Sequence, residues 1–505
     1  MLAKVNSYGL YGLEGFLVDV EVDVSNGLPS FEIVGLPDTA VKESKERVRS
    51  AIKNSGNHFR NGKITVNLAP ADIKKQGAYL DLAIAVGIIK AQGEQNILDI
   101  SGYVLLGELS LDGSLRGVAG ILPMLISAST KGYNKFIIPK ANEKEASYIS
   151  GVEIYALNNL QEVVSLLNST ATFERVIPSD YNKVSTNIEY SNDLCYVKGQ
   201  AFCKRALEVA VSGGHNMLML GPPGAGKSMI AKCVPSIMPD MSFDEALETT
   251  KIHSVAGVLK DDDGIVTKRP FMSPHHTAST VSLMGGGQNA TPGIISLAHN
   301  GVLYLDEMPE YTRSTLESLR QPLEDRVITV SRAKANIMYP ASFMLVGSMN
   351  PCPCGNFGSK DKICTCSSSA IVKYKARISA PLLDRIDIQV SVDNVLYDDL
   401  VSDKKEETSY DVRKRVNTAR NIQRERFKED SINTNAEMGE KHLKKYCKLS
   451  PSCEKLLKTS FESLNLSARA RSRIIKVART IADLDYSEEI LEKHILEAIG
   501  YRGGL

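Results

Sequence analysis

The chain has 505 residues and an almost balanced charge, with 60 lysines and arginines against 59 aspartates and glutamates, for a net charge of +1. This balance excludes a protein that coats a polyanion with its whole surface, and a hydrophobic content of 43% excludes disordered and collagen-like chains. No apolar run approaches the ~20 residues of a membrane helix, and the N-terminus has no apolar signal core. We expect a cytoplasmic protein of several domains that has no membrane partner.

The first 168 residues are predicted to form a mixed α and β domain. Residues 16–24 alternate apolar and polar side chains with the period of two that is typical of a half-buried strand. Apolar residues recur at helical spacing in three further segments, 39–53, 81–91 and 121–131. A polar segment rich in serine, threonine and asparagine follows, and it predicts a linker over residues 169–193.

Strands and helices alternate over residues 194–397, which predicts a central α/β domain with a parallel sheet. A second polar and charged break precedes a region with helical patterning, and we expect a C-terminal helical domain over residues 410–505. The fold class predicted from the sequence is therefore multi-domain α/β.

A glycine-rich loop between a predicted strand and a predicted helix indicates a phosphate-binding site. The segment GPPGAGKS has the spacing G-x-x-x-x-G-K-[ST], in which glycines let successive backbone N–H groups face a phosphate chain. Lys227 would add positive charge at the β- and γ-phosphates, and Ser228 would offer its hydroxyl to Mg²⁺. The alternative is a chance glycine turn, which the flanking strand and helix disfavour. The residues predicted to bind ATP are Gly221, Pro222, Pro223, Gly224, Ala225, Gly226, Lys227 and Ser228.

Two further predicted strands end in polar side chains that complete such a site. GVLYLDE ends in Asp306, which would hold Mg²⁺ together with Ser228, and in Glu307, which would polarise the attacking water. Surface pairs of Asp and Glu are common, but this pair ends an apolar strand downstream of the phosphate loop. FMLVGSMN ends in Asn350, which is placed to sense the γ-phosphate. Arg385, after an apolar run, could serve as an arginine finger, although a lone arginine is more often a salt-bridge partner.

The segments GPPGAGKS, SLAHNGVLYLDEM, SMNPCPCG and ISAPLLDRID resemble the magnesium-chelatase-like AAA+ ATPases, and within them the ComM/YifB subfamily. The resemblance covers essentially the whole chain. It implies a ring-forming ATPase, hexameric in this family, in which Arg385 acts on the nucleotide of a neighbouring subunit. It also matches Arg469 to the family's sensor-2 arginine, whose alternatives are a solvated helix face or a DNA contact.

Two segments of the first domain, APADIKKQGAYLDLAIAVGII and LLGELSLDGSLRGVAGILPM, are similar to the Lon protease domain. That family uses a serine–lysine dyad, in which a desolvated lysine activates the serine hydroxyl. The resemblance places Tyr79 at the serine position and Leu122 at the lysine position, and neither side chain can do this chemistry. We expect a domain that is not a Lon-type protease and that serves in oligomerisation or in gripping a substrate.

Four of the nine cysteines crowd into one short segment, which indicates a metal site in a reducing compartment. Their thiolates suit a tetrahedral Zn²⁺ with a structural role, because four protein ligands leave no open position for catalysis. The alternative is a loop with four reduced surface thiols. The predicted zinc ligands are Cys352, Cys354, Cys364 and Cys366.

The balanced net charge hides an uneven distribution. Residues 441–479 carry eleven lysines and arginines against two glutamates, although a charged helical region is commonly just a solvated face. The segment ITVSRAKANIMYP reads as strand–turn–strand with Arg332 and Lys334 near its tip, and it resembles the presensor hairpin of related helicases. Lys268 and Arg269 belong to a third candidate segment. Contacts of this kind with DNA phosphates are salt-dependent and largely independent of sequence.

The leading hypothesis is an ATP-driven motor that acts on single-stranded or branched DNA, by helicase or branch-migration activity in natural transformation and homologous recombination. The ATPase part depends on motifs in this chain, and the DNA part depends largely on the resemblance. The alternatives are a chelatase-type ATPase that remodels a protein partner and a scaffold whose assembly is timed by nucleotide.

Overall fold

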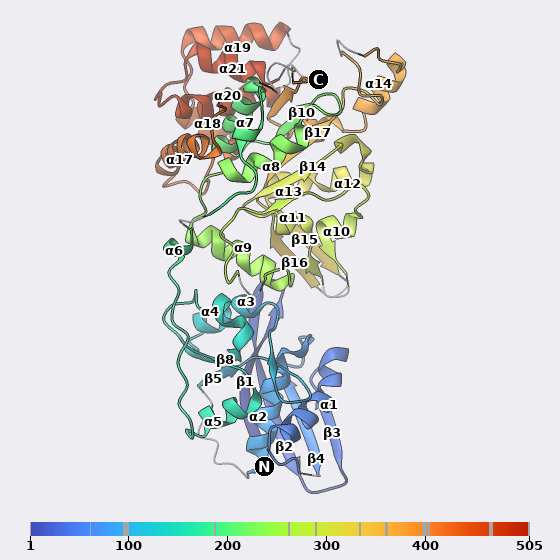
Figure 1. The fold of residues 1–505 in the computed structure, drawn as a ribbon, viewed down its shortest axis with the longest axis vertical. Helices are drawn as coiled ribbons and strands as arrows, with labels where there is room; N and C mark the ends of the chain where they lie inside the picture. The colour runs from blue at the N-terminus through green and yellow to red at the C-terminus, as the bar shows by residue number, and fades with distance from the viewer. Residues whose placement is uncertain are drawn as a thin grey trace. The chain divides into compact units, whose positions relative to one another are not determined.

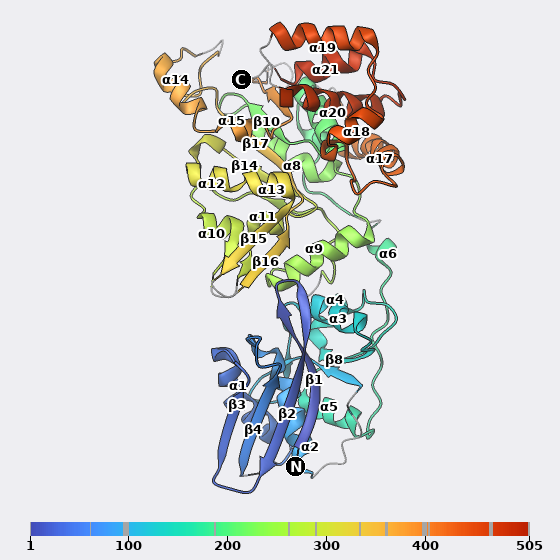
Figure 2. The same ribbon diagram turned by 180° about the vertical axis from the view of Figure 1, so that it is seen from behind.

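The computed structural model describes residues 2–60, 62–93, 100, 102–185, 188–260, 263–287, 290–332, 335–358, 362–395, 401, 405–463 and 468–502. The chain forms two compact units (Figures 1 and 2). The first comprises residues 1–186 together with 243–267, and the second comprises residues 187–242 and 268–505. The segment 243–267 lies in sequence between two parts of the second unit, yet it packs within the first.

The first unit is built on a seven-stranded mixed sheet with the strand order β3-β4-β2-β1-β5-β8-β9. Its strands are β1 (Leu2–Tyr11), β2 (Glu14–Ser25), β3 (Ser30–Val34), β4 (Lys63–Ala69), β5 (Tyr103–Leu105), β8 (Lys135–Pro139) and β9 (Glu153–Leu157), and a small separate hairpin joins β6 (Glu108–Leu109) to β7 (Leu115–Arg116). Its helices are α1 (Thr39–Asn54), α2 (Asp81–Gln92), α3 (Ile121–Thr130), α4 (Glu143–Ala146), α5 (Leu160–Leu167), α6 (Tyr181–Ser185) and α9 (Phe243–Val255), with short turns η1 (Ala78–Leu80) and η2 (Lys140–Asn142).

The core of the first unit lies between the sheet and helices α2 and α3, which pack on β1 and β2. Helix α2 has almost no polar face, and nearly all of its residues are buried, as expected of a helix that is apolar on all sides. Gly87 of α2 permits this packing, because a Cβ there would lie 2.7 Å from a methyl group of Val22. The strand and the three helices predicted in this region are confirmed with end shifts of one or two residues.

Helix α9 is held to the first unit by polar contacts at the start of α3. The backbone N–H of Gly120 donates to the backbone oxygen and to the Oγ of Ser254 in α9. Ser254 also hydrogen-bonds to the buried carboxyl group of Glu145, which accepts from the backbone N–H of Leu122 at 3.3 Å. Burial raises the pKa of Glu145 to about 7. This pocket favours the protonated acid over the carboxylate.

The titration of Glu145 predicts how the stability of the first unit depends on pH. Since its pKa is about 7 in the folded chain against 4.5 for an exposed glutamate, the folded state binds more protons between these values. The free energy of unfolding should fall as pH rises through this window, by up to about 3 kcal/mol. We expect the urea midpoint, followed by far-UV circular dichroism, to drop more between about pH 5.5 and about pH 8 in wild type than in Glu145→Gln. An equal drop in both proteins would contradict this assignment.

The second unit is built on a parallel five-stranded sheet with the order β11-β14-β17-β10-β18. Its strands are β10 (Met217–Leu220), β11 (Phe271–Met272), β14 (Val302–Leu305), β17 (Met344–Met349) and β18 (Ile388–Ser391), with hairpins β12 (Gly285–Gly286) to β13 (Thr291–Pro292) and β15 (Val327–Arg332) to β16 (Ala335–Pro340). The helices around it are α7 (Ala201–Gly213), α8 (Lys227–Ile237), α10 (Thr280–Met284), α11 (Ile294–Leu297), α12 (Arg313–Ser318), α13 (Arg320–Asp325), α14 (Ser368–Lys375) and α15 (Ala380–Leu383), with η3 (Leu194–Tyr196) and η4 (Met308–Glu310).

The C-terminal part of the second unit is helical, as predicted (orange and red in Figure 1). It contains α17 (Ser409–Arg426), η5 (Asn435–Glu437), α18 (Glu440–Tyr446), α19 (Pro451–Ser463), α20 (Ala468–Leu484) and α21 (Glu492–Gly500). Helices α17 and α20 pack on α7, and α17 also packs on α8, so that one hydrophobic core runs from the sheet into this helical region. The helical region therefore holds a fixed position against the sheet.

Candidate nucleotide-binding site

The glycine-rich loop lies between β10 and α8, as the sequence predicts. Gly224 and Gly226 have φ angles of +84° and +86°, in the left-handed region that favours glycine. Gly221 approaches a neighbouring strand end so closely that a Cβ would lie 2.2 Å from the carbonyl oxygen of Val392. All three positions therefore favour glycine. The backbone they allow leads the loop directly into the N-terminus of α8.

Lys227 is the first residue of α8, and its ammonium group lies inside the loop. Its Nζ donates to the backbone oxygens of Gly221 and Pro222 at 2.6 and 2.8 Å, and to Oδ1 of Asn350 at 3.2 Å. Burial lowers the pKa of Lys227, against the carboxylates of Asp306 and Glu307, which act to raise it. The structure thus brings together the predicted phosphate lysine and the predicted sensor asparagine.

Asp306 follows β14 and lies beside the start of α8. Its Oδ2 accepts a 2.9 Å hydrogen bond from the Ser228 hydroxyl, and its Oδ1 accepts one of 2.8 Å from the Tyr304 hydroxyl and another from the Ser348 hydroxyl. Burial acts to raise the pKa of Asp306, but these hydrogen bonds outweigh it and lower the pKa. The site therefore holds an ionised carboxylate beside a hydroxyl group, and these hard oxygen donors fit Mg²⁺.

Glu307 has an exposed side chain on a constrained backbone. Its φ of +48° lies in the left-handed region, which is uncommon for a residue with a side chain. Its backbone N–H is held at 3.1 Å by both Oδ1 of Asp306 and Oγ of Ser348. The strained backbone is fixed beside Asp306, and the carboxylate of Glu307 points to solvent, where water can reach it.

Tyr304 and Ser348 are site residues that the sequence analysis missed. Tyr304 is two residues before Asp306 on β14, so the period-two rule for strands places both side chains on one face. Ser348 lies on the neighbouring strand β17, which pairs with β14 in parallel. Alternation along the strand could have identified Tyr304, whereas Ser348 depends on the strand register.

Arg385 and Arg469 lie together near the N-terminal ends of β10 and β18. Both line a cavity of about 450 Å³, which is also lined by Glu324, Arg473 and Lys476. Arg385 forms an ion pair with Glu324 of α13, and Arg469 lies 3.7 Å from the carboxylate of Asp384. The sequence did not indicate Glu324 as a partner.

This cavity and the glycine-rich loop lie at opposite ends of the strands of the sheet. Strand β10 pairs in parallel with β18, with Met217 opposite Ile388 and Leu220 opposite Ser391. The loop follows the C-terminal end of β10, whereas Arg385 precedes the N-terminal end of β18. The four residues of β10 span about 13 Å, so Arg385 lies at the opposite end of the strands from the loop of its own chain.

Polar contacts at the start of β10 fix the backbone around Arg385. The Asn216 side-chain amide donates to the Arg385 carbonyl oxygen at 2.9 Å, and the Asn216 carbonyl oxygen accepts from the backbone N–H of Asp387. Burial acts to raise the pKa of Asp387, but the His215 ring and the Arg473 guanidinium outweigh it and hold the pKa well below its usual range. The chain segment that carries Arg385 is thereby anchored to the strand that carries the phosphate loop.

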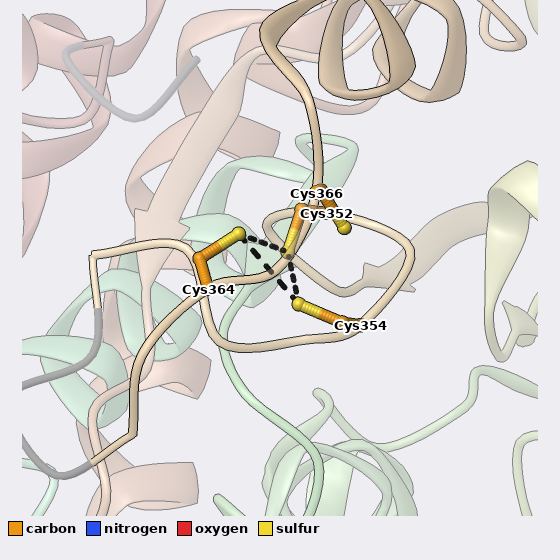
Figure 3. Close-up of side chains that lie close together, drawn as sticks. All are labelled: Cys352, Cys354, Cys364 and Cys366. Carbon is orange, nitrogen blue, oxygen red and sulfur yellow. Dashed lines mark hydrogen bonds between the residues drawn. The ribbon is translucent and has the colours of Figure 1, made fainter.

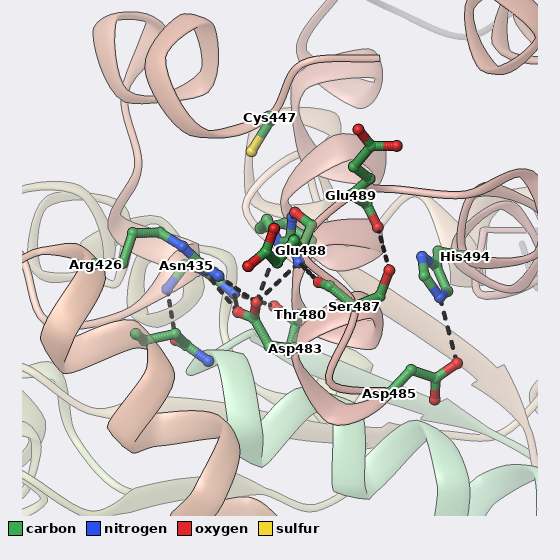
Figure 4. A network of polar contacts seen from close by, with 12 residues as sticks. Arg426, Asn435, Cys447, Thr480, Asp483, Asp485, Ser487, Glu488, Glu489 and His494 are labelled. Atoms are coloured by element: carbon green, nitrogen blue, oxygen red, sulfur yellow. Dashed lines mark hydrogen bonds and ion pairs between the residues drawn. The ribbon is translucent and has the colours of Figure 1, made fainter. Parts of the chain in front are cut away.

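A buried network fixes helix α20, which carries Arg469 near its N-terminal end (Figure 4). The carboxylate of Asp483 accepts from Arg426 and from the Asn435 side-chain amide, both at 2.8 Å, and it also pairs with Arg479. Thr480 hydrogen-bonds to Asn435 and, at 2.8 Å, to the ring of His215. Because His215 also contacts Asp387, the network extends from the helical region to the segment of Arg385.

The four predicted metal ligands form one cluster (Figure 3). Their sulfur atoms all lie within 4.8 Å of one another, and Sγ of Cys352 lies 3.3 Å from that of Cys354 and 3.6 Å from that of Cys364. Zn–S bonds of about 2.3 Å in a tetrahedron place sulfurs about 3.8 Å apart, so the donor set fits Zn²⁺. Backbone N–H groups of Asn356 and Thr365 lower the pKa of the Cys354 thiol to about 5, which favours the thiolate that metals bind.

The four candidate DNA-binding residues differ in their positions. Arg332 ends β15, opposite Ala335 in the predicted hairpin, and Lys334 lies outside the described residues. Lys268 is exposed. Arg269 is buried, and its guanidinium donates to the backbone oxygens of Pro239 and Asn300 at 2.6 and 2.8 Å. These contacts engage Arg269 inside the protein, so the prediction that it binds DNA is not supported by its position.

The two positions matched to the Lon dyad are buried. Tyr79 and Leu122 have 8% and 1% of their surface exposed, and burial raises the pKa of Tyr79 to about 12. Lys75, the nearest lysine before Tyr79 in sequence, is also buried, and its Nζ is engaged by the carbonyl oxygen of Pro70. Tyr79 would therefore remain a neutral phenol at neutral pH.

A parallel sheet with a glycine-rich phosphate loop, a carboxylate and an amide at adjacent strand ends defines a P-loop nucleotide-binding domain. Family models for magnesium chelatase subunit ChlI match residues 193–400 and 20–142, and the model for its C-terminal part matches residues 406–502. YifB of Escherichia coli (strain K12) is 41% identical over 505 residues, with 99% of this chain and 97% of YifB covered. Competence protein ComM of Haemophilus influenzae is 41% identical over 507 residues, with the same coverage.

The chain belongs to the ComM/YifB subfamily of magnesium-chelatase-like proteins, which are ChlI-type AAA+ ATPases. Lon protease 2 of Bacillus subtilis (strain 168) is 28% identical over 201 residues, or 36% of each chain, so the likeness to Lon is partial and distant. Among the residues described in the structure, no helix combines the length and the apolar character needed to cross a membrane.

Proposed function

We propose that this protein is an ATP-hydrolysing, ring-forming motor that acts on DNA in the cytoplasm. The observation that carries the ATPase part is the convergence of Lys227, Ser228, Asp306 and Asn350 on the glycine-rich loop. These side chains come from the start of α8 and from the ends of two strands, β14 and β17, and a chance glycine turn would not assemble them. Their chemical types match the parts that phosphoryl transfer needs.

Each residue of the site has a role in this proposal. Lys227 binds the β- and γ-phosphates, Ser228 and Asp306 hold Mg²⁺, and Asn350 contacts the γ-phosphate. Glu307 orients and polarises the attacking water. Mg²⁺ supplies charge neutralisation at the phosphates when it is bound.

We infer that Arg385 and Arg469 complete the ATP site of a neighbouring subunit. Both line a cavity at the end of the sheet opposite the glycine-rich loop of their own chain, so a ring is needed to bring them to a nucleotide. A closed ring satisfies every site with the same contact, and six subunits is the state expected for this family. From the shared cavity we infer that Arg469 also acts in trans, beside Arg385.

The DNA part of the proposal is supported by the similarity to a protein named for competence and by the basic residues of the helical region. We propose helicase or branch-migration activity on single-stranded or branched DNA, in natural transformation and homologous recombination. A chelatase-type ATPase that remodels a protein, and a nucleotide-gated scaffold, are the competing functions. Stimulation of ATP hydrolysis by DNA distinguishes the motor from both.

The hairpin of β15 and β16 is the proposed DNA contact. We expect the double variant Arg332→Ala, Lys334→Ala to weaken binding of single-stranded DNA by about tenfold at low salt, and to reduce the slope of log affinity against log salt by about 1–2. The control is Lys373→Ala on α14, which removes an exposed lysine outside the hairpin. Fluorescence anisotropy over a salt series measures both quantities. Unchanged affinity and slope would show that the hairpin does not contact phosphates.

We also propose that the four-cysteine cluster holds a structural Zn²⁺. The support is the sulfur geometry and the all-thiolate donor set, which leaves no coordination position for substrate. Metal analysis that finds fewer than about 0.3 zinc ions per chain, in protein purified without chelator, would contradict this proposal.

A further inference from the structure

The segment that leads into the four-cysteine cluster contacts the glycine-rich loop at three points. The backbone N–H of Gly221 donates to the Met349 carbonyl oxygen at 3.1 Å, and Lys227 donates to Oδ1 of Asn350 at 3.2 Å. At the third point, Gly355 packs against the Pro223 ring. A Cβ at Gly355 would lie 2.5 Å from the Cδ atom of that ring, so only a glycine fits in this contact.

The far end of the same segment is tied back to the site. Helix α14 begins at Ser368, and Ser367, which follows Cys366, caps it by accepting from the Ala370 backbone N–H. The Tyr374 hydroxyl of this helix hydrogen-bonds to the backbone of Asn350. Arg377, after the helix, donates to the Pro309 carbonyl oxygen and pairs with Glu310, just beyond Glu307.

The cysteines lie at the base of this loop. Cys352 and Cys354 belong to the chain segment that follows β17, and Cys364 and Cys366 belong to the segment that leads into α14 (Figure 3). A metal that joins the two pairs would fix the spacing between Asn350 and α14. It would also fix Gly355 against Pro223.

We propose that Zn²⁺ in the four-cysteine cluster clamps the nucleotide site, so that zinc binding and ATP binding are thermodynamically coupled. This inference rests on the ATP site proposed above. Without the metal, the loop that carries Gly355 and orients Asn350 loses its closure, and the glycine-rich loop loses a packing partner. Coupling between two sites is reciprocal, so nucleotide must raise the affinity for zinc by the factor by which zinc raises the affinity for nucleotide.

The experiment measures zinc affinity of the full-length protein by competition with a chromogenic chelator, with and without a non-hydrolysable ATP analogue and Mg²⁺. A fluorescent ATP analogue measures nucleotide affinity in the same samples. We expect saturating nucleotide to raise zinc affinity by at least about fivefold in wild type. The Cys195→Ser variant, which removes a thiol outside the cluster, should behave like wild type.

Two variants separate a clamp from a cluster that only supports folding. Cys364→Ser should lose zinc and bind the fluorescent analogue more weakly, by the factor that the coupling predicts. Pro223→Ala should keep zinc but reduce the coupling factor, because it removes the contact with Gly355 and leaves all four thiols in place.

Four results would count against the inference. Wild type without zinc, or a zinc affinity that nucleotide leaves unchanged although the analogue binds, would refute the clamp and leave the ATP site standing. Coupling that Pro223→Ala leaves intact would refute the Gly355 contact as its route. Failure of wild type to bind the analogue would refute the proposed function and the clamp together.

Discussion

Replacing Glu307 with glutamine should leave ATP binding intact and slow hydrolysis by about 10²–10⁴-fold, the usual contribution of a catalytic base. Glu307 is the exposed carboxylate beside Asp306, and its backbone is fixed in a left-handed conformation by Asp306 and Ser348. Glutamine preserves the shape of the side chain but cannot polarise water in the same way. Single-turnover hydrolysis and nucleotide binding, measured separately, test the assignment.

The matched control for Glu307→Gln is Glu310→Gln. Glu310 lies three residues further on, and its carboxylate pairs with Arg377 at the surface. The Glu310→Gln variant should hydrolyse ATP nearly as wild type does, because a surface ion pair contributes little to stability. Near-normal turnover in Glu307→Gln would show that another group activates the water.

Replacing Arg385 with alanine should preserve ATP binding and reduce turnover by about 10³–10⁵-fold, the range found for arginine fingers. The reason is geometric, since Arg385 lies at the end of the strands opposite its own glycine-rich loop and can reach a nucleotide only across a subunit contact. Arg320→Ala is the control, because it removes a half-buried α13 arginine that pairs with Glu317.

Mixed assemblies distinguish action in trans from a structural role of Arg385. In rings that combine Arg385→Ala with Lys227→Ala subunits, some sites join an intact Lys227 to an intact Arg385 from the neighbour. Such mixtures should recover part of the activity that both variants lack alone. Failure of the mixtures to recover, in assemblies shown to contain both variants, would contradict the proposed finger.

The sequence predicts which side chains meet at the candidate site, because these residues follow strands whose ends must meet in a parallel sheet. Lys227, Asp306 and Asn350 were each read from a local motif, and the structure places them within one set of contacts. The sequence does not indicate Ser348, because its contact with Asp306 depends on the register between β14 and β17, which no local pattern encodes. The pairing of Arg385 with Glu324 is not predictable for the same reason, since it joins two helical segments that are far apart in the sequence.

The sequence predicts less of the fold of the first unit than of the candidate site. No simple alternation predicts strand β1, because it mixes apolar residues with Asn6 and Ser7, which are buried. The Ser7 hydroxyl is satisfied by the Leu105 carbonyl oxygen of the neighbouring strand, and this contact exists only once the sheet has formed. Likewise, nothing local to α9 indicates that it packs at the start of α3 through Ser254.

The central claim is that ATP hydrolysis drives work on DNA, and the rate of ATP hydrolysis with and without forked DNA tests it most directly. The measurement uses the full-length protein at low salt, under conditions in which rings form, with Glu307→Gln as the inactive reference. We predict that forked DNA stimulates hydrolysis by wild type and that strand separation or branch migration requires this turnover. Hydrolysis that single-stranded, duplex and forked DNA all leave unchanged would contradict the claim.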